Sequence, residues 1–321
     1  MSRPIVAAHL LISSQDPDDW EKNTFPKLRL DAVDHLIISP FVVAKDGSFI
    51  LENEKVLGPR VDAVVRKVRE EAKNTGRTAK IFAMQFWGTT GIFNLQTSEA
   101  RKKYIAGIPG ILTRYDLDGY DIDYEWNKYD NGNLVPWAPV FLNDVRKQLD
   151  QLGSQKGRKY YLAITPATPA FLHPTEAVGE QWTGGTFNNE ARDYPVTKSV
   201  DYVNVQTYDG GWGEANAVNV WIDSVGFQPS QVLFGICSEE GQDKVPDGTR
   251  WQRPNILDAL SAYQSDKTNQ PLAGVHLWRL NGNTPWSNKV QAVIFNWFHD
   301  VQLKDSMTLK AAVTEWKKNT A

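Results

Sequence analysis

Features that would assign a protein to several common classes are scarce in this sequence of 321 residues. A single cysteine, Cys237, excludes an internal disulfide framework, and no uninterrupted apolar stretch approaches membrane-spanning length. The net charge is −3 and no basic stripe is present, which argues against nucleic-acid binding. The first residues show no clear signal-peptide pattern, so an extracellular and a cytoplasmic location both stay open.

Signatures of metals and cofactors are also missing. His35, His173 and His299 show no metal-ligand spacing, and no Gly-x-Gly-x-x-Gly turn follows the first apolar run. We therefore expect no metal and no cofactor, and a monomer that binds neither nucleic acid nor membrane. One residue type is plentiful instead, since the chain has 12 tryptophans. Indole faces are surfaces on which sugar rings stack.

The chain alternates between short apolar runs rich in β-branched residues and amphipathic segments. Eight runs read as strands buried on both faces: Ile5–Ile12, Val33–Val43, Lys80–Trp87, Gly119–Glu125, Tyr160–Thr165, Val200–Tyr208, Val232–Cys237 and Ala273–Leu280. Segments with helical period lie between them: Val61–Ala72, Ser98–Tyr115, Trp137–Leu152, Val218–Val225, Asn255–Ser265 and Ser287–Phe298.

Eight strand–helix units predict an α/β protein, a single-domain (β/α)8 TIM barrel, over residues 1–300. A doubly wound open sheet is the competing architecture, but its glycine-rich first turn is missing. Residues 301–321 are predicted to be a C-terminal helical extension packed on the barrel, with a helix at Ser306–Lys317.

The most unusual run is DGYDIDYEW, at residues 118–126. In a strand, Asp121, Asp123 and Glu125 project from one face, and two tyrosines and an isoleucine project from the other. Carboxylates this close cannot all ionise freely, so we expect raised pKa values and shared protons. A solvated acidic edge strand conflicts with the apolar opposite face, and a calcium site would use a glycine-broken loop. A catalytic role is therefore favoured.

Other polar and aromatic groups follow the ends of the predicted strands. Barrel enzymes place their chemistry at the C-terminal ends of strands, where Glu125 ends the fourth strand. The third, sixth and eighth strands carry QFW at 85–87, QTYD at 206–209 and HLWR at 276–279. The fold would bring these groups together over one pocket.

At these positions the chain resembles glycoside hydrolase family 18, the family of chitinases and endo-β-N-acetylglucosaminidases. The spacing Asp118-x-x-Asp121-x-Asp123-x-Glu125 is similar to the family signature. The family also has a tyrosine at the end of strand six, matched by Tyr208, and a tryptophan on strand eight, matched by the tryptophan of GVHLW. The resemblance covers nearly the whole predicted barrel.

The resemblance implies a mechanism in which the substrate supplies its own nucleophile. Glu125 would protonate the glycosidic oxygen while the acetamido oxygen of the sugar attacks C1. Asp123 would orient the acetamido group, and Asp121 would bond to Asp123 and share its proton. Tyr208 would donate its hydroxyl to the acetamido oxygen, and Trp278 would form the floor beneath the reacting sugar.

Two departures from the family pattern bear on the substrate. The end of strand three reads AMQFWGTTG rather than the common Ser-x-Gly-Gly turn, and only about 35 residues separate Cys237 from Ala273, too few for the insertion domain of larger members. The cleft should therefore be shallow. Gln206, two residues before Tyr208, resembles the compact plant-type chitinases and the endo-β-N-acetylglucosaminidases.

Further candidates for sugar contacts come from the same loops. Gln206 and Asp209 belong to the end of strand six, and Trp126, Trp87 and Trp212 could stack on sugars in neighbouring subsites. Packing within the barrel or its loops is the alternative for Trp87 and Trp126, because aromatic residues usually pack.

The sequence thus predicts a retaining glycosidase that cleaves β-1,4 linkages of N-acetylglucosamine. Action on the chitobiose core of N-glycans is slightly favoured over action on chitin or chitooligosaccharides. A barrel that binds such sugars without cleaving them is the alternative of another class.

Overall fold

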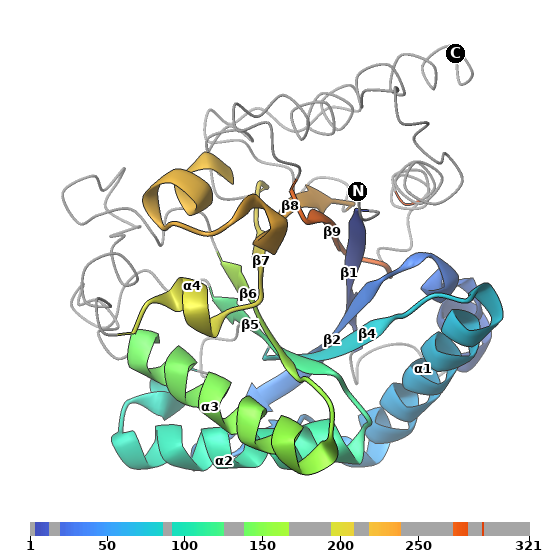
Figure 1. Cartoon of the computed structure of the whole chain (residues 1–321). Coiled ribbons are helices and arrows are strands. Elements are labelled where there is room, and N and C mark those ends of the chain that lie inside the picture. The colour runs from blue at the N-terminus through green and yellow to red at the C-terminus, as the bar shows by residue number, and fades with distance from the viewer. Residues whose placement is uncertain are drawn as a thin grey trace.

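The structure is a closed barrel of parallel strands. The computed structural model describes residues 4–12, 20–85, 92–124, 138–166, 194–208, 218–238, 272–281 and 291 (Figure 1). Eight parallel strands form the ring: β1 (Ile5–Leu11), β2 (His35–Val43), β4 (Lys80–Gln85), β5 (Gly119–Tyr124), β6 (Tyr161–Pro166), β7 (Tyr202–Val205), β8 (Val232–Cys237) and β9 (Gly274–Trp278). The strands follow one another in sequence order, and pairing of β1 with both β2 and β9 closes the ring. The predicted single-domain (β/α)8 barrel is confirmed.

In the described ranges, three long helices lie on the outer side of the ring (Figure 1): α1 (Glu54–Thr75), α2 (Ser98–Arg114) and α3 (Ala138–Lys156). Helix α1 begins before the predicted Val61 because Leu57 extends its buried stripe of valines toward the N-terminus. It ends at Thr75 and is capped by Gly76, whose φ of 67° gives the left-handed conformation that glycine favours at this position. A short helix, α4 (Val196–Ser199), precedes β7.

Other predicted helices are altered or lie outside the described residues. Within the predicted segment at 218–225 the chain forms a π-helical turn, Val220–Ser224. The helices predicted at 255–265 and 306–317 lie outside the described residues, as does the segment at 287–298 apart from Gln291. The predicted C-terminal extension, residues 301–321, also lies outside them.

A short antiparallel strand, β3 (Phe49–Leu51), was not predicted. It pairs with the end of β2, where Phe41 faces Leu51. The connecting turn contains Gly47, whose φ of 82° favours glycine, and the side chain of Asp46 accepts a hydrogen bond from the Ser48 backbone N–H at 3.0 Å. An Asp-Gly pair between apolar runs is a hairpin signal, so the sequence does contain the necessary information.

The strands bury both of their faces. Their outward residues pack against the helices in one large apolar cluster, which includes Leu36, Tyr120 and Leu277. The inward residues form a smaller cluster around Phe82 and Met84. Because side chains alternate along each strand, several buried polar residues also face inward, among them His9, Asp121 and Asn204. The barrel interior therefore combines a small apolar cluster with buried polar side chains.

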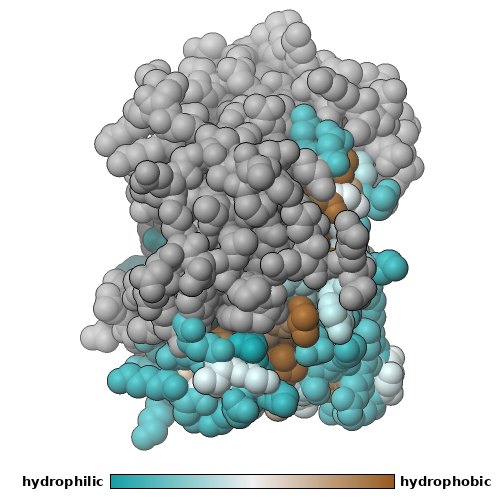
Figure 2. Space-filling view, turned by 90° about the vertical axis from the view of Figure 1, so that its left-hand side faces the viewer, coloured by the Kyte–Doolittle hydropathy of each residue, from teal (hydrophilic) through white to brown (hydrophobic). Residues whose placement is uncertain are grey.

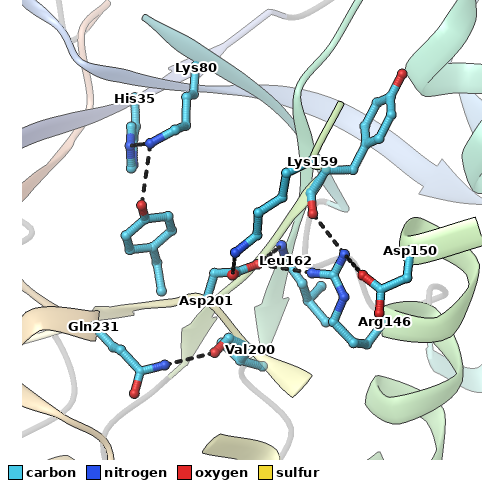
Figure 3. Close-up of polar contacts among 11 residues, drawn as sticks. His35, Lys80, Arg146, Asp150, Lys159, Leu162, Val200, Asp201 and Gln231 are labelled. Atoms are coloured by element: carbon cyan, nitrogen blue, oxygen red, sulfur yellow. Dashed lines mark hydrogen bonds and ion pairs between the residues drawn. The ribbon is translucent and has the colours of Figure 1, made fainter. Parts of the chain in front are cut away.

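The N-terminal ends of alternate strands are held by an aspartate–arginine arrangement, shown for Asp201 in Figure 3. Asp201 directly precedes β7, and its Oδ2 accepts hydrogen bonds from Arg146 Nη1 and from the Leu162 backbone N–H of β6, each at 2.9 Å. Two further aspartates, each directly before a strand, bond in the same way to an arginine and to a backbone N–H of the preceding strand: Asp34 with Arg77 and Val6, and Asp118 with Arg69 and Ile81. We call these three sites the aspartate clamps.

Lys80 occupies the same mouth of the barrel. Its Nζ lies 3.3 Å from His35 Nε2 and 3.3 Å from the Tyr202 hydroxyl (Figure 3), and 4.5 Å from the centre of the Tyr161 ring. Burial, followed by the charge of Lys80, lowers the pKa of His35 to about 3, so His35 is neutral at physiological pH. These contacts fill the N-terminal mouth with side chains.

The described surface carries few exposed apolar side chains. On the side seen in Figure 2 it is mainly hydrophilic, with small hydrophobic areas between polar ones. Large exposed apolar residues in the described ranges come from separate elements: Ile50, Val56, Val140 and Tyr194. None of the helices among the described residues has the length and apolar character needed to cross a bilayer.

Candidate active site

Strand β5 carries two of the predicted acids into the barrel. Asp121 and Asp123 are 0% and 4% exposed, while Tyr120 and Ile122 are buried on the outward face. The strand therefore alternates as the sequence predicts. The third acid, Glu125, follows directly after β5 and lies outside the described residues.

Neutral hydrogen-bond donors surround Asp121. The Thr165 hydroxyl donates to its carboxylate, with Oγ1 2.9 Å from Oδ1 and 3.1 Å from Oδ2. The side-chain amide of Asn204 donates to Oδ2 at 2.9 Å. These donors come from β6 and β7, and both residues are buried. Asp121 is thus fixed by strands that lie next to it and next but one in the ring.

The pKa of Asp121 is raised to about 7. Burial is the largest cause, and the hydrogen bonds from Thr165 and Asn204 lower the pKa in part. The sequence predicts such a rise, but from crowding of carboxylates, whereas desolvation dominates in the structure. At neutral pH the group is therefore able to hold or to release a proton.

Asp123 lies one layer closer to the C-terminal mouth. The side-chain amide of Gln206 donates to Asp123 Oδ1 and to the Thr165 backbone carbonyl, each at 3.4 Å. Gln206 directly follows β7 and is buried. The predicted sugar-binding residue Gln206 therefore contacts the predicted catalytic residue Asp123.

Aromatic side chains line the interior near these acids. The rings of His9 and Trp278 are 5.4 Å apart, as are those of His9 and His276. Tyr208, after β7, has its ring 6.0 Å from that of His276. A Cβ on Gly235 of β8 would lie 2.3 Å from the Val205 carbonyl oxygen and 2.7 Å from His276 Nε2, so only glycine fits at this position.

Both histidines of this cluster are neutral. Burial, followed by the repulsion that two protonated rings would exert on each other, lowers the pKa of His9 well below its usual range. Burial lowers the pKa of His276 to about 4, although its Nε2 lies 2.8 Å from the Val205 carbonyl oxygen. The contacts of His9 with Thr165 and of His276 with Tyr208 depend on the register of the barrel strands.

The chain after β9 is held by Ser238. Its backbone N–H donates to the Trp278 carbonyl at 2.6 Å, and its hydroxyl donates to the Arg279 carbonyl at 2.8 Å. The same hydroxyl accepts the Arg279 backbone N–H at 3.1 Å. The peptide bond between Trp278 and Arg279 is cis. Ser238, which directly follows β8, therefore fixes the backbone that carries Trp278.

The structure thus brings together five of the predicted site residues, Asp121, Asp123, Gln206, Tyr208 and Trp278, on strands β5, β7 and β9 or directly after them. The other predicted residues lie outside the described residues: Glu125, Trp126, Trp87, Trp212 and Asp209. Within the described ranges, no group of three or more histidine, cysteine or acidic side chains is arranged to hold a metal ion.

Known chitinases are similar to this chain in sequence. A probable class II chitinase of Arthroderma benhamiae is 34% identical over 136 residues, which are 39% of this chain and 39% of that protein. Endochitinase 37 of Trichoderma harzianum is 25% identical over 267 residues, 77% of this chain and 75% of that protein. The match to the first of these relatives thus spans about two fifths of its length.

Solved structures and a family model extend the likeness to the whole barrel. The crystal structure of a chitinase from Bacteroides thetaiotaomicron matches with a TM-score of 0.64 at 16% identity, over 95% of this chain and 100% of that one, and thus shares the fold. The model of the glycosyl hydrolases family 18 matches residues 14–319. The chain therefore belongs to glycosyl hydrolase family 18, a family of glycosidases, as its sequence predicts.

Proposed function

We propose that the protein is a retaining glycosidase that cleaves β-1,4 linkages of N-acetylglucosamine, with the acetamido group of the substrate as nucleophile. The observation that carries the proposal is the buried pair Asp121 and Asp123, which points into the C-terminal half of the barrel next to Gln206. Burying two neighbouring carboxylates is costly for folding, so such a pair is typical of a catalytic site.

In this proposal the acids divide the work. Glu125 protonates the leaving oxygen, which requires a carboxyl group that stays protonated near the working pH. Asp123 orients the acetamido group and stabilises the positive charge that develops on its nitrogen. Asp121 exchanges a proton with Asp123, and its pKa of about 7 suits that exchange at neutral pH.

Tyr208 and Trp278 position the sugar. Tyr208 donates its hydroxyl to the acetamido oxygen, and Trp278 forms the floor of the subsite. Both side chains contact the buried histidine cluster, which limits their movement. Positioning of this kind lowers the barrier because the attacking oxygen is already held near C1.

Two substrate classes share the scissile linkage. The names of the relatives, a probable class II chitinase and an endochitinase, favour chitin or chitooligosaccharides. Gln206 and the short connection between Cys237 and Ala273 slightly favour the chitobiose core of N-glycans. Incubation with chitotetraose and, separately, with a high-mannose glycopeptide, followed by mass spectrometry, distinguishes the two by their products.

The variant Glu125→Gln tests the chemistry itself. It keeps the shape of the side chain but removes the acidic proton, so turnover should fall by at least about 100-fold while sugar binding persists. Glu99→Gln, the same change at an exposed position in the first turn of α2, is the matched control and should leave turnover unchanged. A wild-type protein that binds both sugars without forming product would refute the proposal in favour of a sugar-binding barrel.

A further inference from the structure

Asp121 lies at one end of a buried chain of hydrogen bonds that the proposed chemistry does not use. The Thr165 hydroxyl, 2.9 Å from Asp121 Oδ1, is also 3.4 Å from His9 Nε2. The Asn204 amide is 3.2 Å from the same hydroxyl, in addition to its bond to Asp121. His9, Thr165 and Asn204 lie on β1, β6 and β7, and all three are buried.

Counting protons fixes the direction of this chain when Asp121 is ionised. A threonine hydroxyl has one proton to donate and two lone pairs that accept, whereas a carboxylate only accepts. Thr165 must therefore donate to Asp121, and its lone pairs face the donors of Asn204 and His9. His9 then carries its single ring proton on Nε2.

Protonation of Asp121 permits the reverse direction. A neutral Asp121 donates its own proton to the Thr165 oxygen, and the hydroxyl proton of Thr165 is free to point at His9. His9 Nε2 must then accept, so the ring proton moves to Nδ1. Asn204 donates in both states, since its amide group is not reversed by the change.

We propose that Thr165 and His9 are positioning residues that couple the charge state of Asp121 to the tautomer of His9. The inference rests on the proposed function for one point, that Asp121 gains and loses a proton during the catalytic cycle. The chain gives that proton transfer a structural consequence on the far side of the barrel, where the His9 ring packs against Trp278.

Near neutral pH, the ionisation of Asp121 should change the tautomer of His9 rather than its charge. Burial keeps His9 and His276 neutral, so the tautomer of His9 changes while its charge does not. The inward side chains of the neighbouring strands are mostly uncharged in the described ranges. The titratable groups that face this region from β5, from the end of β7 and from β9 are Asp123, Tyr208 and His276.

Nuclear magnetic resonance on the sugar-free protein tests the coupling. Carboxyl ¹³C shifts of Asp121, assigned with Asp121→Asn, follow its ionisation between pH 5 and 9, and ring ¹⁵N shifts of His9 report the tautomer. We expect the Nε2–H form of His9 to increase with the same midpoint as the ionisation of Asp121.

Two variants of Thr165 separate the coupling from a merely structural role. Thr165→Val keeps the shape but removes the hydroxyl, so the His9 tautomer should no longer depend on pH. The pKa of Asp121 should rise, because the carboxylate loses a donor, and its acid dissociation constant should therefore fall about tenfold. Thr165→Ser restores the hydroxyl and should restore both behaviours.

Two results would overturn the inference: a His9 tautomer that stays constant while wild-type Asp121 titrates, or a Thr165→Val protein that titrates as the wild type does. Both measurements are made without substrate. Failure of the proposed function would instead appear as a wild-type protein that releases no product from either sugar, whatever the spectra show. An active wild-type enzyme with a pH-independent His9 would refute the coupling alone.

Discussion

The clamp formed by Asp118 should be a major source of stability for the barrel. Its Oδ2 accepts hydrogen bonds from Arg69 Nη2 and from the Ile81 backbone N–H, each at 2.8 Å. The carboxylate is 16% exposed, and Arg158 lies 3.6 Å from its other oxygen. Asp118→Asn keeps the size of the side chain but removes its charge, so both bonds to Oδ2 weaken and Arg69 and Arg158 keep only Asp116 as a carboxylate partner.

The expected loss is about 2–4 kcal/mol. A hydrogen bond that involves a charged group contributes about 1.5–3 kcal/mol, and the partial exposure of Arg69 reduces the sum of the two bonds. Unfolding in guanidinium chloride measures the loss as a lower transition midpoint with an unchanged slope.

A second aspartate provides the control for this measurement. Asp46 also bonds to a backbone N–H, that of Ser48, and pairs with Lys103, but its side chain is 61% exposed. Asp46→Asn should therefore lower the midpoint much less than Asp118→Asn does, because solvent screens an exposed ion pair. Equal midpoints for the variants at Asp118 and Asp46 would show that the clamp adds nothing beyond a surface ion pair, and the reasoning would be wrong.

Three further predictions concern the site. Between pH values of about 4 and 7, Asp121 is protonated in the folded protein but ionised in the unfolded chain, because its pKa is raised on folding. The free energy of unfolding should therefore fall by up to about 4 kcal/mol as the pH rises through that window. Asp121→Asn should lack this fall when unfolding midpoints at pH 5 and pH 8 are compared. Gly235→Ala places a methyl group against the Val205 carbonyl and should cost at least about 2 kcal/mol, whereas Gly110→Ala on α2, with open space around it, should stabilise by about 0.5–1 kcal/mol; equal thermal midpoints would contradict this. Ser238→Ala removes both hydrogen bonds of the hydroxyl to Arg279 and should lower kcat/KM about tenfold on chitotetraose, and unchanged kinetics would separate Ser238 from the positioning of Trp278.

The strands of the barrel were predictable where burial alone decides the pattern. The segment Val232–Cys237 agrees in both bounds, since it is apolar throughout and buried on both faces. The strand predicted at 200–208 is shorter in the structure, Tyr202–Val205. Of its last residues, Gln206 forms only an isolated β-bridge, and Thr207 and Tyr208 lie beyond the pairing. Apolar periodicity does not mark the residue at which a strand stops pairing.

The partners of Asp121 could not be predicted for a different reason. Thr165 and Asn204 are ordinary residues of apolar runs, 44 and 83 positions away from Asp121 along the chain. Their contact with Asp121 depends on the stagger of three strands, and a shift by one residue would turn each side chain to the opposite face. A spacing motif within one strand is legible in the sequence, whereas a network across strands requires the register.

Asp118 and Asp121 illustrate how one strand serves two purposes. Asp118 precedes β5 at the N-terminal mouth, where it contacts two arginines and a backbone N–H. Asp121 lies three residues further along, inside the barrel, where Thr165 and Asn204 are neutral donors to its carboxylate. Cationic partners favour the ionised form of a carboxylate and connect neighbouring strands. At Asp121 the donors are neutral, so burial has the larger effect on the pKa, and the proton stays exchangeable near neutral pH. Arginines contact the carboxylate at the N-terminal mouth, and none is present in the described surroundings of Asp121. This difference distinguishes the start of β5, which stabilises the barrel, from its interior part, which we propose carries out the chemistry.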